Sequence, residues 1–220
     1  MIFFEQVSKQ FKQHIVLDEI TLRVQEGEQI ALIGANGAGK TTLMRCLLGE
    51  YFYHGKIAVR GLDPHLHRQT VLHHIGFVPQ LPPPLKMPVG QLIHFAAGVC
   101  KVNSKNIIEL IEKLGLDIQN FLSRPFVKLS GGQKQKILIA IALGRGSDIL
   151  IMDEPAANLD PQARQIFFDL LKEKQQHAMM LISSHRLDEL TTLVNRVIEL
   201  DKGQIVLAKS LSSPHEEGKG

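Results

Sequence analysis

The sequence predicts an α/β protein with a mostly parallel β-sheet, and three features support that prediction. Residues 29–33 form a short apolar run that ends in glycines, a pattern typical of a buried parallel strand. A helix is expected to follow over residues 40–48, closed by glycine. A second apolar run at residues 149–152 precedes Asp160-Pro161, a dipeptide that caps and opens a further helix.

More strands are expected toward both ends of the chain. Residues 2–7, 15–24 and 56–60 alternate apolar and polar side chains between turn residues, which predicts an N-terminal antiparallel β-subdomain. Residues 178–182 and 196–200 are short and largely apolar, and we expect each to add a strand to the core.

The middle of the chain has a different character. The segment Leu81-Pro82-Pro83-Pro84 is incompatible with a regular helix or a central strand, and it predicts a stiff connector. Helical periodicity follows, with Ser104 as a candidate N-cap and Gly115 as a stop. We therefore predict one domain over residues 1–220, with a core at residues 1–80 and 146–208, a helical subdomain at 81–145 and a flexible tail at 209–220.

Composition excludes several functional classes. The chain has 220 residues, 44% of them hydrophobic and 5% aromatic, with a formal net charge of +3 and no concentrated basic run, so no nucleic-acid partner is expected. We find no secretory signal and no apolar run near the roughly 18 residues of a membrane span. Cys46 and Cys100 are far apart and are expected to be reduced thiols.

One glycine-rich segment predicts a phosphate site. Residues 34–41 match the pattern G-x-x-x-x-G-K-[ST] and lie between a predicted strand and a predicted helix. Glycines let successive backbone N–H groups point at phosphate oxygens, and the helix N-terminus adds partial positive charge. The core is therefore expected to be that of a P-loop NTPase. The predicted phosphate and Mg²⁺ contacts come from Gly34, Asn36, Gly37, Ala38, Gly39, Lys40, Thr41 and Thr42.

Two carboxylates complete the predicted site. Asp153 and Glu154 directly follow the apolar run at residues 149–152, at the strand end where open α/β sheets bind ligands. One carboxylate can bind Mg²⁺ and the next can polarise an attacking water. The pattern is weak alone and becomes strong downstream of a phosphate loop.

The segment Leu129-Ser130-Gly131-Gly132-Gln133 resembles the signature motif of the ATP-binding-cassette (ABC) family. The resemblance covers about residues 2–208 and implies ATP and Mg²⁺ as cofactors. It implies that Phe11 stacks on adenine, that Gln80 contacts Mg²⁺ and the attacking water, and that His185 binds the γ-phosphate. It also implies that Asp153 binds the metal and that Glu154 is the general base.

The resemblance also implies a second subunit. In the family, the signature closes on ATP held by another copy, so Ser130, Gly132, Gln133 and Asp160 are expected to act at a dimer seam with two ATP molecules. The dimer can be a homodimer or a heterodimer. Separate transmembrane permease subunits are the implied partners, which puts the chain on the cytoplasmic face of the inner or plasma membrane as a transport ATPase. Export is slightly favoured over import.

Alternative functions stay open at this point. A non-transport cassette ATPase in DNA repair, chromosome maintenance or translation is the first alternative, and a P-loop kinase or GTPase is the second. The chain departs from the family pattern at Lys134, Lys136 and Ile141, where arginine is common, and at residues 144–148, which lack the usual proline. A His-rich segment, residues 65–74, favours a solvated loop and helix over a metal site.

Overall fold

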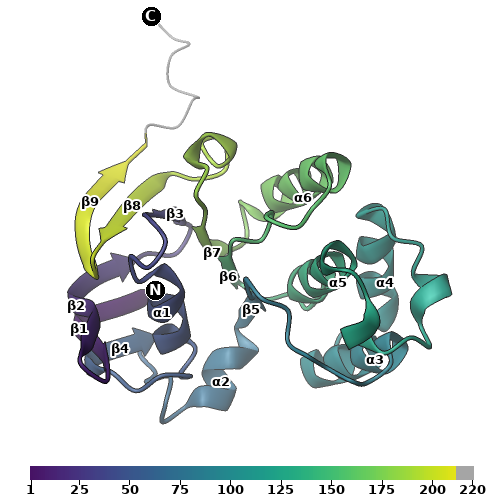
Figure 1. Ribbon diagram of the computed structural model, residues 1–220, viewed down its shortest axis with the longest axis horizontal. Helices are drawn as coiled ribbons and strands as arrows, with labels where there is room; N and C mark the ends of the chain where they lie inside the picture. The colour runs from purple at the N-terminus through teal and green to yellow at the C-terminus, as the bar shows by residue number, and fades with distance from the viewer. Residues whose placement is uncertain (212–220) are drawn as a thin grey trace, which may run out of the picture. The chain divides into compact units, whose positions relative to one another are not determined.

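The computed structural model describes residues 1–211, which form two compact units (Figure 1). Among the described residues, the first unit contains residues 1–72 and 179–211, and the second contains residues 73–178. Within the described residues, no helix has the length and apolar character needed to cross a membrane.

Two groups of strands build the first unit. A three-stranded antiparallel sheet has the order β2-β1-β4, which matches the predicted β-subdomain. Beside the phosphate loop, β3 pairs in parallel with β7 and with β8, and β8 pairs antiparallel with β9. The elements of this unit are β1 (Ile2–Phe11), β2 (His14–Val24), β3 (Gln29–Ile33), α1 (Lys40–Leu47), β4 (His54–Val59), α2 (Arg68–His73), β7 (Met179–Ser183), η3 (Leu187–Glu189), β8 (Arg196–Asp201) and β9 (Gln204–Ser210).

The second unit combines a parallel strand pair with helices. Strands β5 and β6 pair in parallel, and α4 packs on both α3 and α5 (Figure 1). Residues 81–145 contain helices and connecting loops. The elements are β5 (Ile75–Val78), α3 (Val89–Cys100), α4 (Ser104–Lys113), η1 (Ile118–Phe121), η2 (Phe126–Lys128), α5 (Gly131–Gly144), β6 (Ile149–Asp153) and α6 (Pro161–Lys174).

Buried strands form the core of each unit. Every residue of β6 is buried, and so are all residues of β7, which explains why both read as continuous apolar runs. Phe126 and Phe167 are fully buried in the second unit. Burying a side chain of this size stabilises the fold by roughly 1.5–3 kcal/mol.

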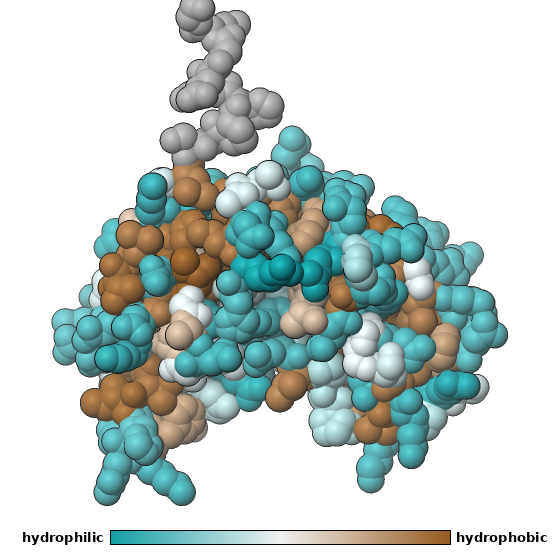
Figure 2. All heavy atoms as spheres, turned by 45° about the horizontal axis from the view of Figure 1, so that its top comes forward, coloured by the Kyte–Doolittle hydropathy of each residue, from teal (hydrophilic) through white to brown (hydrophobic). Residues whose placement is uncertain are grey.

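The surface mixes polar and apolar side chains. On the face in Figure 2, hydrophilic side chains separate groups of hydrophobic ones. On α3, Phe95 and Val99 are 63% and 57% exposed, and Leu81 before this helix is 74% exposed. Phe95 and Val99 are four positions apart, so they share one helix face.

The structure corrects two local predictions. The N-cap of α4 is Asn103, whose side chain accepts a hydrogen bond from the Lys105 amide at 2.9 Å, whereas Ser104 is already helical. The predicted flexible tail begins at residue 209, yet Lys209 and Ser210 belong to β9 and pair with Val197 and Arg196 of β8. Residues 212–220 of the predicted tail lie outside the described residues.

Candidate nucleotide site

The phosphate loop connects β3 to α1 and depends on glycine geometry. Gly34, Gly37 and Gly39 have φ values of 142°, 83° and 110°, which L side chains rarely adopt. A Cβ at Gly34 would collide with the Leu200 carbonyl oxygen, and one at Gly39 would lie 2.8 Å from the Val16 carbonyl oxygen. The neighbouring strands therefore pack too closely on the loop to accept side chains at Gly34 and Gly39.

Lys40 begins α1 and is only 6% exposed. Its ammonium group donates hydrogen bonds to the carbonyl oxygens of Gly34, at 2.7 Å, and Ala35, at 3.1 Å. A buried charge needs such partners, because burial without them is costly. Thr41 and Thr42 follow in the first turn and are half-buried. Asn36 and Ala38 lie in the same loop, with the Ala38 amide bonded to the Ala35 carbonyl.

The predicted carboxylates lie at the end of β6 in the second unit. Asp153 ends the strand and is 2% exposed, and Glu154 follows with a φ of 50°. A positive φ is uncommon for a residue other than glycine and costs about 1–3 kcal/mol, so surrounding contacts must hold it. The Ala157 amide donates to the Glu154 carbonyl oxygen at 3.2 Å, which closes a turn immediately after the strand. Gln80 is exposed two residues after β5.

The signature segment forms the N-terminus of α5. The Ser130 hydroxyl oxygen accepts from the Gln133 amide at 3.2 Å, and the Gln133 side chain accepts from the Ser130 amide at 3.0 Å. This reciprocal capping box satisfies two of the helix's terminal N–H groups. A hydroxyl has one hydrogen to donate besides its acceptor sites, so Ser130 can still donate to an anion. A Cβ at Gly132 would lie 2.9 Å from the Asn158 carbonyl oxygen.

Residues 154–160 run along the first turns of α5. Gln135 donates from Nε2 to the Pro155 carbonyl oxygen at 2.9 Å, and Lys136 lies 2.8 Å from an Asp160 carboxylate oxygen. The other Asp160 oxygen accepts from the Ala163 amide at 2.8 Å and caps α6. The Lys136 side chain and then the Ala163 amide hold the pKa of Asp160 below its ordinary value. The signature and this loop are therefore physically joined.

Two more predicted residues, Phe11 and His185, also lie in the first unit. Phe11 ends β1 and is 39% exposed, with its ring 5.1 Å from the Tyr51 ring in an edge-to-face arrangement. The Lys9 ammonium lies 4.6 Å from the centre of the Phe11 ring, so this aromatic face already contacts a cation. His185 is exposed two residues after β7.

The predicted residues divide between the two units. The first unit brings the phosphate loop together with β3 and α1, and it also contains Phe11 and His185. The second unit contains Gln80 and joins the carboxylate turn to the signature helix. Sequence reasoning missed Gln135 and Tyr51. The only signal for Gln135 was a polar residue in a helix whose later turns are apolar.

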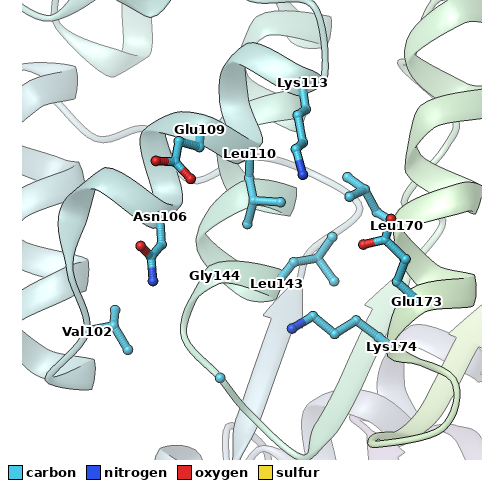
Figure 3. Close-up of a pocket in the computed structure, with 11 residues that line it drawn as sticks. Val102, Asn106, Glu109, Leu110, Lys113, Leu143, Gly144, Leu170, Glu173 and Lys174 are labelled. Atoms are coloured by element: carbon cyan, nitrogen blue, oxygen red, sulfur yellow. The ribbon is translucent and has the colours of Figure 1, made fainter.

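A pocket of about 380 Å³ lies in the second unit away from these motifs (Figure 3). Leu110, Leu143 and Leu170 come from α4, α5 and α6 and line it together with Lys113 and Lys174. None of the predicted site residues contributes to it. In the His-rich segment, His65 stacks on Phe52 at a ring distance of 4.8 Å.

Residues 17–157 match the family model described as ABC transporter. The chain belongs to the ABC transporter family. The ATP-binding proteins of this family are ATPases, so this ABC domain binds and hydrolyses ATP. The P-loop NTPase fold and the ATPase activity expected from the sequence are thereby confirmed.

Individual relatives span nearly the whole ABC domain. It is 34% identical over 215 residues to the arginine transport ATP-binding protein ArtM of Bacillus subtilis, covering 94% of this chain and 90% of that one. It is 33% identical over 218 residues to the Nod factor export ATP-binding protein I of Cupriavidus metallidurans, covering 96% and 70%. A dimeric ATP-binding cassette bound to ADP and Pi has the same fold, with a TM-score of 0.84, 22% identity and coverage of 97% and 100%.

Proposed function

We propose that this ABC domain is the motor subunit of a transporter and that ATP joins two such subunits. In each half of the dimer, the phosphate loop of one subunit would hold ATP and the signature of the other would bind its γ-phosphate. The capping box at Ser130 carries this proposal, because it uses the hydroxyl oxygen within the helix and leaves the hydroxyl hydrogen and nearby N–H groups to bind an anion.

The residues also fit Mg²⁺. Asp153 supplies a buried carboxylate and Thr41 a hydroxyl at the start of α1, and hard oxygen ligands of this kind suit the ion. Gln80 would supply an amide oxygen. When bound, Mg²⁺ would neutralise charge on the phosphates. Lys40 would then bind the β- and γ-phosphates and Phe11 would stack on adenine.

The chain's own groups would carry out hydrolysis by positioning. Glu154 would accept a proton from the attacking water, and His185 would hydrogen-bond the γ-phosphate and orient that water. Backbone N–H groups of the phosphate loop would stabilise charge on the transferring group. Loss of phosphate removes the anion that holds the two subunits together, so the dimer would open after each cycle.

The dimer can be tested with a hydrolysis-deficient protein. Glu154→Gln should form a dimer in MgATP, measured by light scattering, because the bridging phosphate persists. Adding Ser130→Asp should leave a monomer that still binds ATP. Aspartate caps helices as well as serine does, so α5 keeps its cap while the new charge repels phosphate. A stable dimer of the double variant would contradict the proposal.

Separate transmembrane subunits are the proposed partners, at the cytoplasmic face of the inner or plasma membrane. The exposed apolar residues Phe95, Val99 and Leu81 support a docking surface of this kind. Phe95→Glu should reduce co-purification with solubilised membrane subunits and leave the Glu154→Gln dimer intact. Recovery with ribosomes or DNA instead would favour a non-transport role.

The export direction remains a prediction. The relatives include proteins named for arginine transport and for Nod factor export, so similarity does not separate the two directions. Sealed vesicles reconstituted with the identified membrane partner would separate them, because uptake and release of cargo have opposite signs.

A further inference from the structure

Gln135 is an unusual residue for the interior of α5. Its side chain is 0% exposed, and its Nε2 donates to the Pro155 carbonyl oxygen at 2.9 Å. Its Oε1 is also buried, with no hydrogen-bond partner among residues 1–211. An apolar side chain of the same size would avoid burying that oxygen. The same change would leave the Pro155 carbonyl oxygen without this donor, so the hydrogen bond to Pro155 is what favours glutamine at this position.

The hydrogen bond from Gln135 is accepted by Pro155, the residue after the predicted general base, Glu154. Pro155 directly follows Glu154, whose φ of 50° is uncommon for a residue other than glycine. Within this turn, the Ala157 amide donates to the Glu154 carbonyl oxygen at 3.2 Å. The Gln135 carboxamide fixes the turn from the side of α5, at the peptide that joins Pro155 to Ala156.

The same helix begins with the signature. Ser130 caps α5, and Gln135 follows about one and a half turns later on a continuous helix. Gly132 packs closely on Asn158, and Lys136 pairs with Asp160, so the loop follows the helix over its first two turns. A displacement at the signature end would therefore be transmitted to the turn that carries Glu154.

We propose that Gln135 is a positioning residue, whose carboxamide holds the Glu154 turn in register with the signature end of α5. ATP hydrolysis depends on this bond, whereas ATP binding to the phosphate loop does not. The inference rests on the proposed role of Glu154 as general base.

Gln135→Met tests the bond, since methionine fills a similar volume and cannot donate. The turnover number kcat should fall by about 10- to 100-fold, the scale expected when a catalytic group is displaced by about 1 Å. The KM for ATP should stay roughly unchanged. Gln29→Met is the matched control: Gln29 is 4% exposed, and its carboxamide oxygen accepts from Asn195 at 2.9 Å, far along the chain from this turn. It should lower stability and leave kcat unchanged.

Gln135→Glu adds a readout that a merely structural role would not move. A buried carboxyl group has a raised pKa, and only its protonated form can donate to the Pro155 carbonyl. The charged groups bonded to the same loop or helix turn are Arg164, which donates to the Ala156 carbonyl, and the Lys136–Asp160 pair, with Glu154 adjacent. The kcat of Gln135→Glu, relative to wild type, should therefore rise as pH falls, while that of Gln135→Met should stay low at every pH.

The outcomes separate this inference from the proposed function. Equal kcat values for Gln135→Met and Gln29→Met would overturn the positioning role, and so would a Gln135→Glu profile parallel to that of the wild type. Full ATPase activity in Glu154→Gln would overturn the base assignment itself. An inactive Glu154→Gln together with a fully active Gln135→Met would reject only the inference about Gln135.

Discussion

Replacing Gly39 with alanine should destabilise the nucleotide-free protein by about 2–5 kcal/mol. Its φ of 110° lies in a region that costs an L side chain roughly 1–2 kcal/mol. A Cβ there would also lie 2.8 Å from the Val16 carbonyl oxygen and 2.9 Å from Leu17 Cδ2. Both atoms belong to β2, whose ladder resists movement, so overpacking adds about 1–3 kcal/mol.

Gly37 supplies the matched control in the same loop. Its φ is 83°, yet no heavy atom lies within 4 Å of a Cβ built there. Gly37→Ala should therefore lose only the conformational part, about 1–2 kcal/mol. The assay is urea unfolding without nucleotide, with both variants and the wild type compared at equal m-values. Equal midpoints for Gly37→Ala and Gly39→Ala would show that close packing on Val16 does not constrain the loop.

Three other predictions follow from burial and charge. Phe167 is fully buried, so Phe167→Ala should cost about 3–5 kcal/mol by calorimetry, and a loss below 1 kcal/mol would contradict its place in the core. The lowered pKa of Asp160 means that its pairing stabilises the fold above the ordinary aspartate pKa, and that this contribution is lost as pH falls through the lowered value. Asp160→Asn should therefore reduce the loss of stability at acidic pH. An unchanged loss of stability at acidic pH would refute this prediction. Burial raises the pKa of Cys46 to about 12, so at pH 8 a thiol reagent should modify half-buried Cys100 first, and equal rates by mass spectrometry would contradict the structure.

Local signals predicted much of the fold. Residues 29–33 match β3, whose first four residues are buried, and Gly49 follows the end of α1 with a φ of 66°, which suits glycine. Strand β9 is not predicted from the sequence, because six of its seven residues are exposed and the strand has no alternation of buried and exposed side chains. The position of the α4 cap was missed by one residue because Asn103 and Ser104 are both good capping residues.

The roles of the candidate site residues stay predictions, but the sequence indicates local segments of the site better than contacts between distant segments. Residues 34–41 predict a phosphate loop, since the glycine spacing and Lys40 lie within one short segment. The bond from Gln135 to Pro155 spans 20 residues, and no short pattern reveals it. The edge-to-face contact of Phe11 with Tyr51 has the same origin, because it joins the end of β1 to a loop 40 residues later.

The intraloop hydrogen bonds of Lys40 have a consequence for nucleotide affinity. The ammonium group is buried and bonded to two carbonyl oxygens, so it loses its water when the protein folds and not when nucleotide binds. If Lys40 binds phosphate as proposed, the ligand would replace neutral acceptors with charged ones, and charge-assisted hydrogen bonds are the stronger kind. Binding of the anion would thus gain attraction without a further dehydration cost for the lysine.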